Sequence, residues 1–141
     1  MLQELDGKII QLDGSLLGFE SLNQFTIRTI EGNPLFALLQ SEEEEGVGLV
    51  VASPFNFFKE FTFEIPEQEK EQLQLEQHED ALVLGILTLR NPFKSSTMNL
   101  MAPIVVNIAN MKGMQLVLPP KYDYSARTPI SEKIAAEGGG Q

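Results

Sequence analysis

LVLGILTLR, residues 82–90, reads as a long central β-strand, because apolar side chains occupy both of the faces that alternate along an extended chain. Shorter runs rich in branched and aromatic residues lie on either side of it. Residues 25–30 (FTIRTI) alternate as a half-buried strand requires. The other predicted strands cover residues 8–12, 35–40, 47–52, 61–65, 104–109 and 114–118.

Turn signals separate these runs. Gly32 can adopt a positive φ and Pro34 fixes its own φ, so residues 31–34 (EGNP) predict a turn. Residues 110–113 (NMKG) predict a hairpin between the last two strands. About eight short strands at this spacing predict an all-β, mainly antiparallel fold, either a sandwich or a small closed or partly closed β-barrel. Closure is favoured because it removes exposed strand edges.

One short helix is also predicted. Pro66 suits the first helical position, where its missing N–H costs nothing. Glu67 then lies near the positive end of the helix dipole, and Glu71 shares its face because the two are four residues apart. Leu73, with Leu75 beyond it, would hold this helix against the barrel.

The chain has 141 residues, which suits one domain. We expect a single β-barrel domain over residues 1–120 and a loosely ordered C-terminal tail over residues 121–141, with a frayed helix at residues 131–136. No apolar run reaches the roughly 18 residues that cross a bilayer. The N-terminus lacks the basic start and apolar core of a signal peptide. The sequence therefore predicts a cytoplasmic protein that does not engage membranes.

The net charge of −10 is concentrated in the middle of the chain. Residues 42–80 hold twelve acidic residues and two lysines, whereas acids and bases balance in the rest of the chain. A negative field repels phosphate backbones, so direct nucleic-acid binding is not expected, and it would attract a basic protein. Acidic runs also occur as merely solvated faces, and the charge by itself leaves both interpretations open.

Nothing in the composition indicates an enzyme, a metal site or a cofactor. The chain has no cysteine and a single histidine, His78, and no serine elbow motif accompanies it. This set does not supply the ligands of a transition-metal site. Residues 42–45 are four consecutive glutamates, which lack the alternating ligands and fixed glycine of a calcium loop, so a solvated loop is expected.

A cluster of phenylalanines follows Pro54. Phe55, Phe57 and Phe58 cannot all point the same way in a turn-like segment, and most phenylalanines are core residues. The alternative is that one or two of them lie at the surface beside the acidic stretch. They would then form an apolar anchor with a charged rim, as protein-binding patches do.

An ordered set of segments resembles the bacterial flagellar assembly factor FliW family. No single segment decides the resemblance, but their order along most of the chain is specific. Met98 departs from the small residue expected at its position. The segments are residues 14–19 (GSLLGF), 35–41 (LFALLQS) with the acidic loop after it, 51–58 (VASPFNFF), 86–89 (ILTL), 97–107 (TMNLMAPIVVN) and 113–118 (GMQLVL).

The resemblance implies a small β-barrel-like monomer in the cytoplasm. Proteins of this family bind CsrA, the carbon storage regulator, a small basic RNA-binding dimer that blocks translation of flagellin messenger RNA. They also bind unsecreted flagellin. The implied function is partner switching: accumulated flagellin occupies the protein, and once flagellin is exported the freed protein captures CsrA, so that flagellin is translated again.

The acidic stretch suggests which residues would face CsrA. Two other functions stay open, namely a flagellin-binding chaperone without a regulatory partner, which would use the phenylalanine cluster, and a β-barrel that carries a small ligand in its interior. The candidate protein-binding residues are Glu67, Glu71, Glu76, Glu79, Asp80, Phe55, Phe57 and Phe58.

Overall fold

The structure, a computed structural model, describes residues 2–130. No helix in this range is long and apolar enough to cross a membrane. The strands are β1 (Ile9–Gln11), β2 (Gln24–Ile30), β3 (Asn33–Ser41), β4 (Gly48–Ala52), β5 (Ala81–Thr88), β6 (Thr97–Asn107), β7 (Lys112–Gln115) and β8 (Thr128–Pro129). The one α-helix is α1 (Glu67–Leu73), and the short 3₁₀ helices are η1 (Leu2–Leu5), η2 (Pro54–Asn56), η3 (His78–Asp80), η4 (Phe93–Ser95) and η5 (Pro120–Tyr122).

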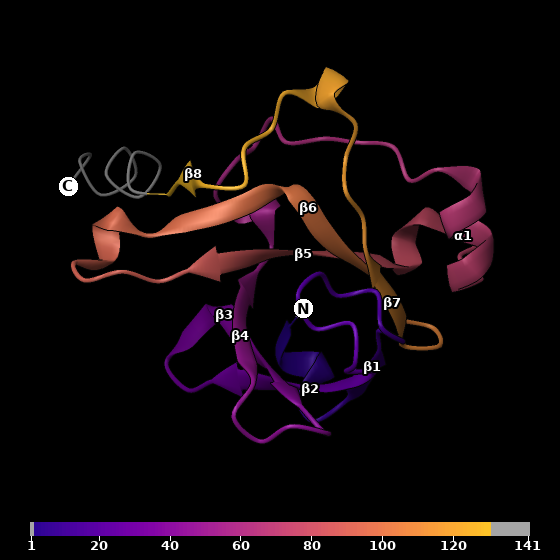
Figure 1. The fold of residues 1–141 in the computed structure, drawn as a ribbon, viewed down its shortest axis with the longest axis horizontal. Coiled ribbons are helices and arrows are strands. Elements are labelled where there is room, and N and C mark those ends of the chain that lie inside the picture. The colour runs from indigo at the N-terminus through magenta and orange to yellow at the C-terminus, as the bar shows by residue number, and fades with distance from the viewer. Residues whose placement is uncertain (1, 131–141) are drawn as a thin grey trace.

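The eight strands form one sheet whose hydrogen bonds close into a ring (Figure 1). Their order is β5-β4-β3-β2-β1-β7-β6-β8, and β5 also pairs with β6, so that β8 alone stands outside the ring. Every pairing is antiparallel except that of β1 with β7. The predicted all-β, mainly antiparallel class with one short helix is confirmed, and so is the predicted hairpin, which joins β6 to β7.

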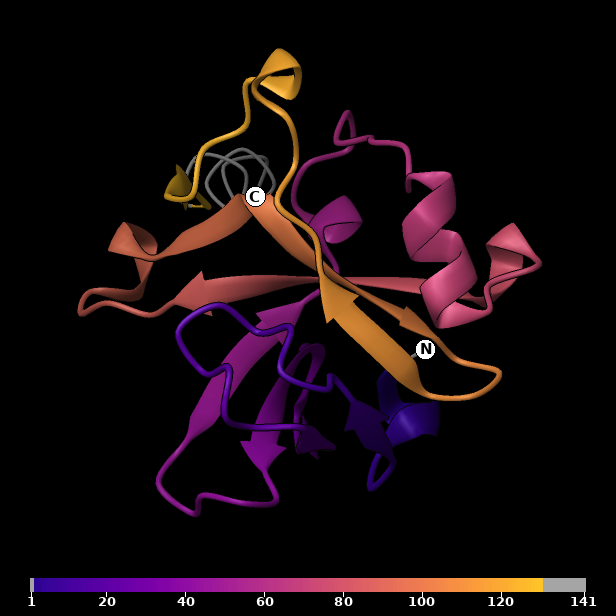
Figure 2. The same cartoon turned by 45° about the vertical axis from the view of Figure 1, so that its right-hand side comes forward.

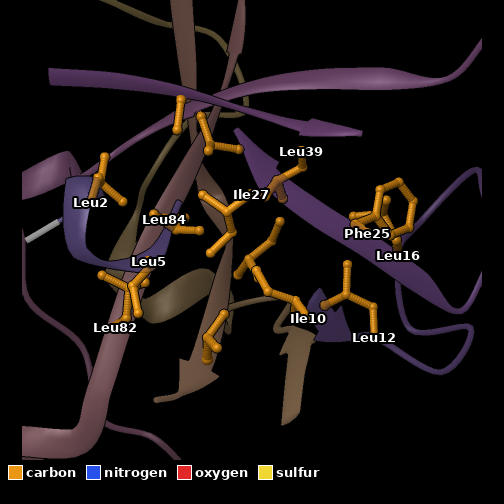
Figure 3. Close-up of a cluster of buried hydrophobic side chains, with 14 of the residues drawn as sticks. Leu2, Leu5, Ile10, Leu12, Leu16, Phe25, Ile27, Leu39, Leu82 and Leu84 are labelled. Carbon is orange, nitrogen blue, oxygen red and sulfur yellow. The ribbon is translucent and has the colours of Figure 1, made fainter. Parts of the chain in front are cut away.

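One hydrophobic cluster fills the interior of the ring (Figure 3). Phe25 and Ile27 of β2 have no exposed surface, as the alternation predicted, but Thr26 between them is also buried. Leu84 of β5 and Ile104 of β6 belong to the same cluster and are equally buried. Side chains therefore occupy the space that a small-ligand carrier would need to keep open.

A second cluster, here called the outer cluster, covers the opposite face of β5 and β6. The strands contribute Leu87, Met98 and Val105 to it. Both faces of β5 are therefore covered, which is why residues 82–87 carry no polar side chain. The connection between β4 and β5 and the chain after β7 pack on these strands with Phe57, Phe61, Leu73, Leu116, Leu118 and Ile130.

Strand β6 is longer than predicted and carries a bulge. Its register with β5 shifts midway along the two strands. Within the bulge, the Asn99 Oδ1 atom accepts hydrogen bonds from the backbone N–H groups of Met101 and Ala102, each at 3.0 Å. This side chain supplies partners that the interrupted ladder cannot. The predicted strand at residues 104–109 therefore corresponds to the second half of β6 only.

Residues 61–65 (FTFEI) are not a strand, contrary to the prediction. Their side chains do alternate between more and less exposed positions, but the backbone finds hydrogen-bond partners other than a neighbouring strand. The Tyr124 Oη atom accepts the N–H of Thr62 at 3.0 Å, and the Tyr122 Oη atom accepts the N–H of Glu64 at 3.0 Å. Two tyrosine hydroxyls thus replace the strand that the alternation had suggested.

Residues 121–130, which the sequence predicted to be part of a loosely ordered tail, pack against the sheet. Thr128 of β8 pairs with Met98 of β6. Ile130 has no exposed surface and completes the outer cluster. This part of the chain is ordered because it buries apolar surface that β5 and β6 would otherwise expose. The helix predicted at residues 131–136 lies outside the described residues.

Candidate functional site

Two of the predicted acidic residues lie one turn apart on α1. Glu67 and Glu71 are both exposed. The Lys70 Nζ atom lies 3.8 Å from the Glu67 Oε1 atom, an exposed ion pair of the kind that stabilises only weakly. Pro66 lies at the N-cap position, one residue before the first helical position that was predicted for it. Gln74 follows the last helical residue and adopts the left-handed conformation, with φ at 55°.

A surface groove of about 560 Å³, here called the α1 groove, lies between α1 and the segments that flank it in the sequence. Phe63, Ile65 and Leu75 line it as half-buried apolar residues that pack on the outer cluster. Exposed carboxylates outnumber cations at its edge, so an apolar floor lies in a negative field. The charged and polar lining residues are Glu64, Glu67, Lys70, Glu76, Gln77 and His78.

Glu71 lines an adjoining hollow of about 520 Å³ that shares Glu67 and Glu76 with the α1 groove. The structure thus brings three of the five predicted acidic residues together. Glu79 and Asp80 lie on η3 and line neither hollow. Their part in a binding surface stays a prediction.

Buried contacts at the C-terminal end of α1 hold the groove in place. Leu73 is 2% exposed and belongs to the outer cluster. The Asn107 side chain, also 2% exposed, donates from Nδ2 to the carbonyl oxygens of Leu73 at 2.9 Å and Gln74 at 3.1 Å. Its Oδ1 atom accepts the N–H of Ala109 at 3.0 Å. A buried amide at the end of β6 therefore positions the helix that carries the acidic residues.

The second group of acids, residues 42–45, lies in the β3–β4 loop on a different part of the surface from α1 (Figure 2). Glu42 and Glu43 tie this loop to β2, since Glu42 accepts a hydrogen bond from the Thr26 hydroxyl and Glu43 accepts backbone N–H groups. Arg28 lines a surface hollow together with Glu42 and Glu43. Among residues 2–130, no group of three or more His, Asp or Glu side chains is arranged to hold a metal ion. The acidic residues of this protein are thus divided between the β3–β4 loop and the surface around α1.

Glu43 makes the stability of this loop depend on pH. Its carboxylate accepts the backbone N–H groups of Gln24 and Asn23, which hold its pKa below the ordinary value of 4.5. A lowered folded-state pKa stabilises the fold above the unfolded pKa, and the effect disappears as the pH falls through the folded value. We expect Glu43→Gln to lower the free energy of unfolding at neutral pH, with the difference vanishing at an acidic pH below the folded-state pKa of Glu43.

Urea denaturation of Glu43→Gln and of the native protein at both pH values measures this difference. The matched control is Glu44→Gln, a change at an exposed neighbour in the same loop, which should leave the free energy of unfolding unchanged at either pH. A Glu43→Gln effect of the same size at both pH values would contradict the assignment.

The phenylalanine cluster is mostly core. Phe57 is 4% exposed and Phe58 is half-buried, because both pack on the outer cluster. Phe57 therefore cannot offer its side chain to a partner, which corrects the prediction for that residue. Phe55 is 45% exposed, and its ring centroid lies 5.7 Å from that of Phe61. Only Phe55 remains as a clearly exposed apolar side chain of this cluster.

Sequence reasoning missed the apolar floor of the α1 groove. Phe63, Ile65 and Leu75 come from both sides of the helix in the sequence, and Glu64 lies between the first two. The alternation of residues 61–65 was the signal that could have found them, because it places Phe63 and Ile65 on one face. Which element would pack beside that face was not visible in the sequence.

The chain is similar to known proteins over nearly all of its described length. A family model described as "FliW protein" matches residues 2–130. The flagellar assembly factor FliW of Bacillus velezensis is 42% identical over 113 residues, which cover 80% of this chain and 79% of that protein. The protein of the same name from Clostridium kluyveri is 38% identical over 130 residues, covering 92% and 89%. A crystal structure of the flagellar assembly factor FliW superposes with a TM-score of 0.81 at 30% identity, covering 86% of this chain and 84% of that chain.

Proposed function

The chain belongs to the FliW family, whose curated members are named flagellar assembly factors, and from this premise we propose that it binds the translational regulator CsrA and antagonises its repression of flagellin translation. When unsecreted flagellin accumulates, it occupies the protein instead, so that the two partners exchange. Under this proposal the protein works by binding in the cytoplasm, as a monomer when free, and catalyses no reaction.

The α1 groove is the observation that supports this proposal. It combines an apolar floor of Phe63, Ile65 and Leu75 with the exposed carboxylates of Glu67 and Glu76. Protein-binding patches commonly have an apolar centre and a polar rim. A negative rim would speed encounter with a basic protein such as CsrA and disfavour nucleic acid. The floor would then supply the contact that holds the complex.

Antagonism requires more than contact. The protein must bind RNA-free CsrA more tightly than RNA-bound CsrA, because a ligand shifts an equilibrium only by its difference in affinity for the two states. Flagellin would relieve this effect by lowering the concentration of free protein. Neither step needs a metal, a cofactor or a covalent change.

Reversal of the three clustered charges tests the CsrA site. We expect Glu67→Lys/Glu71→Lys/Glu76→Lys to bind purified CsrA roughly tenfold or more weakly at low salt, because the rim would repel a basic partner. Isothermal titration at several salt concentrations measures the loss, which should shrink as added salt screens the charges. Thermal unfolding checks that the variant remains folded.

The control is Glu44→Lys/Glu45→Lys, which introduces positive charge in the β3–β4 loop, away from α1. It should bind CsrA nearly as the native protein does. Equal CsrA affinity for the folded triple variant and the native protein at every salt concentration would refute the site. Separate titrations with flagellin and CsrA test the wider proposal, since a protein that binds only flagellin would be a chaperone without a regulatory partner.

A further inference from the structure

An apolar hollow of about 340 Å³ is here called the β3–β4 hollow. It is lined in part by Leu89, which follows β5 at the end of that strand farther from α1 (Figure 1). Three of its side chains are well exposed for apolar residues: Ile30 is 40% exposed, Leu89 50% and Phe93 42%. Phe36 and Val50 are half-buried between them. The one polar residue in its lining is Asn33. The α1 groove shares none of these residues.

The hollow is supported from beneath by the core. The Phe93 ring stands edge-on to the Phe36 ring, with centroids 6.0 Å apart at 85°. The Phe36 ring in turn lies 5.8 Å from that of Phe57, which is buried in the outer cluster. Because a buried ring backs it, the hollow does not need to form when a partner arrives. Phe57, one of the predicted binding residues, thus supports the β3–β4 hollow from below through its contact with Phe36.

The charges near the hollow are opposite in sign to those of the α1 groove. Arg90 follows Leu89, and Lys94 follows Phe93. One acid, Glu31, adjoins Ile30. Two cations against one acid is a local positive excess on a chain whose net charge is −10.

We propose that the β3–β4 hollow is a second docking surface, which receives the apolar side chains of an amphipathic helix of a partner protein whose flanks are acidic. Apolar anchors would enter between Ile30, Leu89 and Phe93, and the flanking carboxylates would face Arg90 and Lys94. The α1 groove has the opposite sign and lies at the other end of β5. The two surfaces can therefore select partners of opposite charge without competing for the same residues.

A pair of synthetic helical peptides tests this proposal on the intact protein. Both carry leucines at helical spacing, and the remaining positions are glutamate in one peptide and lysine in the other. Fluorescence anisotropy should show tighter binding of the glutamate peptide, and Leu89→Ser/Phe93→Ser should weaken that binding roughly tenfold. Arg90→Ala/Lys94→Ala should reduce the preference for glutamate over lysine and flatten the salt dependence.

Val117→Ser is the matched control, because Val117 is an apolar residue with 59% exposure that does not line the hollow. It should leave peptide binding unchanged. The proposal is overturned if the lysine peptide binds equally well, or if Leu89→Ser/Phe93→Ser binds the glutamate peptide like the native protein. It is also overturned if sedimentation shows a dimer that Leu89→Ser/Phe93→Ser abolishes, since the hollow would then bind a second copy. CsrA affinity of this variant reports on the α1 groove separately.

Discussion

Met98→Ala is expected to lower the free energy of unfolding by about 2–5 kcal/mol. Met98 has no exposed surface and lies in β6 at the heart of the outer cluster. Its side chain rests on Gly85 of β5: a Cβ atom built at Gly85 would lie 2.5 Å from the Met98 Sδ atom and 2.8 Å from its Cγ atom. The long side chain therefore occupies space that the glycine leaves free, and truncation leaves a cavity.

Gly85→Ala should also destabilise, by about 1–3 kcal/mol, because the added methyl group collides with the buried Met98 side chain. In the double variant Gly85→Ala/Met98→Ala the methyl group enters the cavity and no longer collides. We expect the two changes to be less harmful together than their sum, with a coupling free energy of about 1 kcal/mol or more.

Urea denaturation of the four proteins completes this double-mutant cycle. Gly46→Ala is the control, since a Cβ atom at Gly46 meets nothing within 4 Å, and it should be nearly neutral. Strict additivity of Gly85→Ala and Met98→Ala would show that the two positions do not share one packing site.

Asn107→Asp is expected to destabilise the fold by about 1–3 kcal/mol and to loosen α1. The change keeps the shape of the side chain but replaces a donor of two hydrogen bonds with an acceptor. The carbonyl oxygens of Leu73 and Gln74 would then face an oxygen instead of an N–H group in a buried place. The Gln74 carbonyl oxygen would lose this side-chain donor, the Leu73 carbonyl oxygen would keep only the Asn110 side chain, and the α1 groove would lose part of its support.

Two measurements separate the local effect from the global one. Urea denaturation gives the free energy of unfolding, and amide hydrogen exchange should show faster exchange in α1 than in the interior strands. The control is Asn110→Asp, whose side chain also reaches the Leu73 carbonyl oxygen, at 3.1 Å, but is exposed. It should have a much smaller effect. Unchanged stability and exchange in Asn107→Asp would show that this amide does not position the helix.

Local patterns in the sequence were enough for the class of the fold. The alternation in residues 25–30 identified β2, and the apolar run at residues 82–90 identified a strand covered on both faces. Gly32, with φ at 80°, marked the turn between β2 and β3. Such features depend on neighbours within a few residues, so they can be read without knowing what packs against them.

Contacts between residues far apart in the sequence determined the structure of segments that local patterns did not predict correctly. Residues 61–65 alternate like a strand, but hydroxyl groups of Tyr122 and Tyr124 occupy their backbone N–H groups. Residues 121–130 take their conformation because Thr128 pairs with β6 and Ile130 packs in the outer cluster. A local pattern shows that a segment can be extended or half-buried, and only the tertiary contacts show which surface completes it.

The candidate site divides in the same way. The helix that bears Glu67 and Glu71, and the excess of acid around it, could be predicted from the sequence alone. Only the tertiary structure separated these acids from residues 42–45, placed Glu76 beside them and set an apolar floor between them. Charge and periodicity are properties of the chain itself, whereas a surface is made by segments that meet only when the sheet has closed.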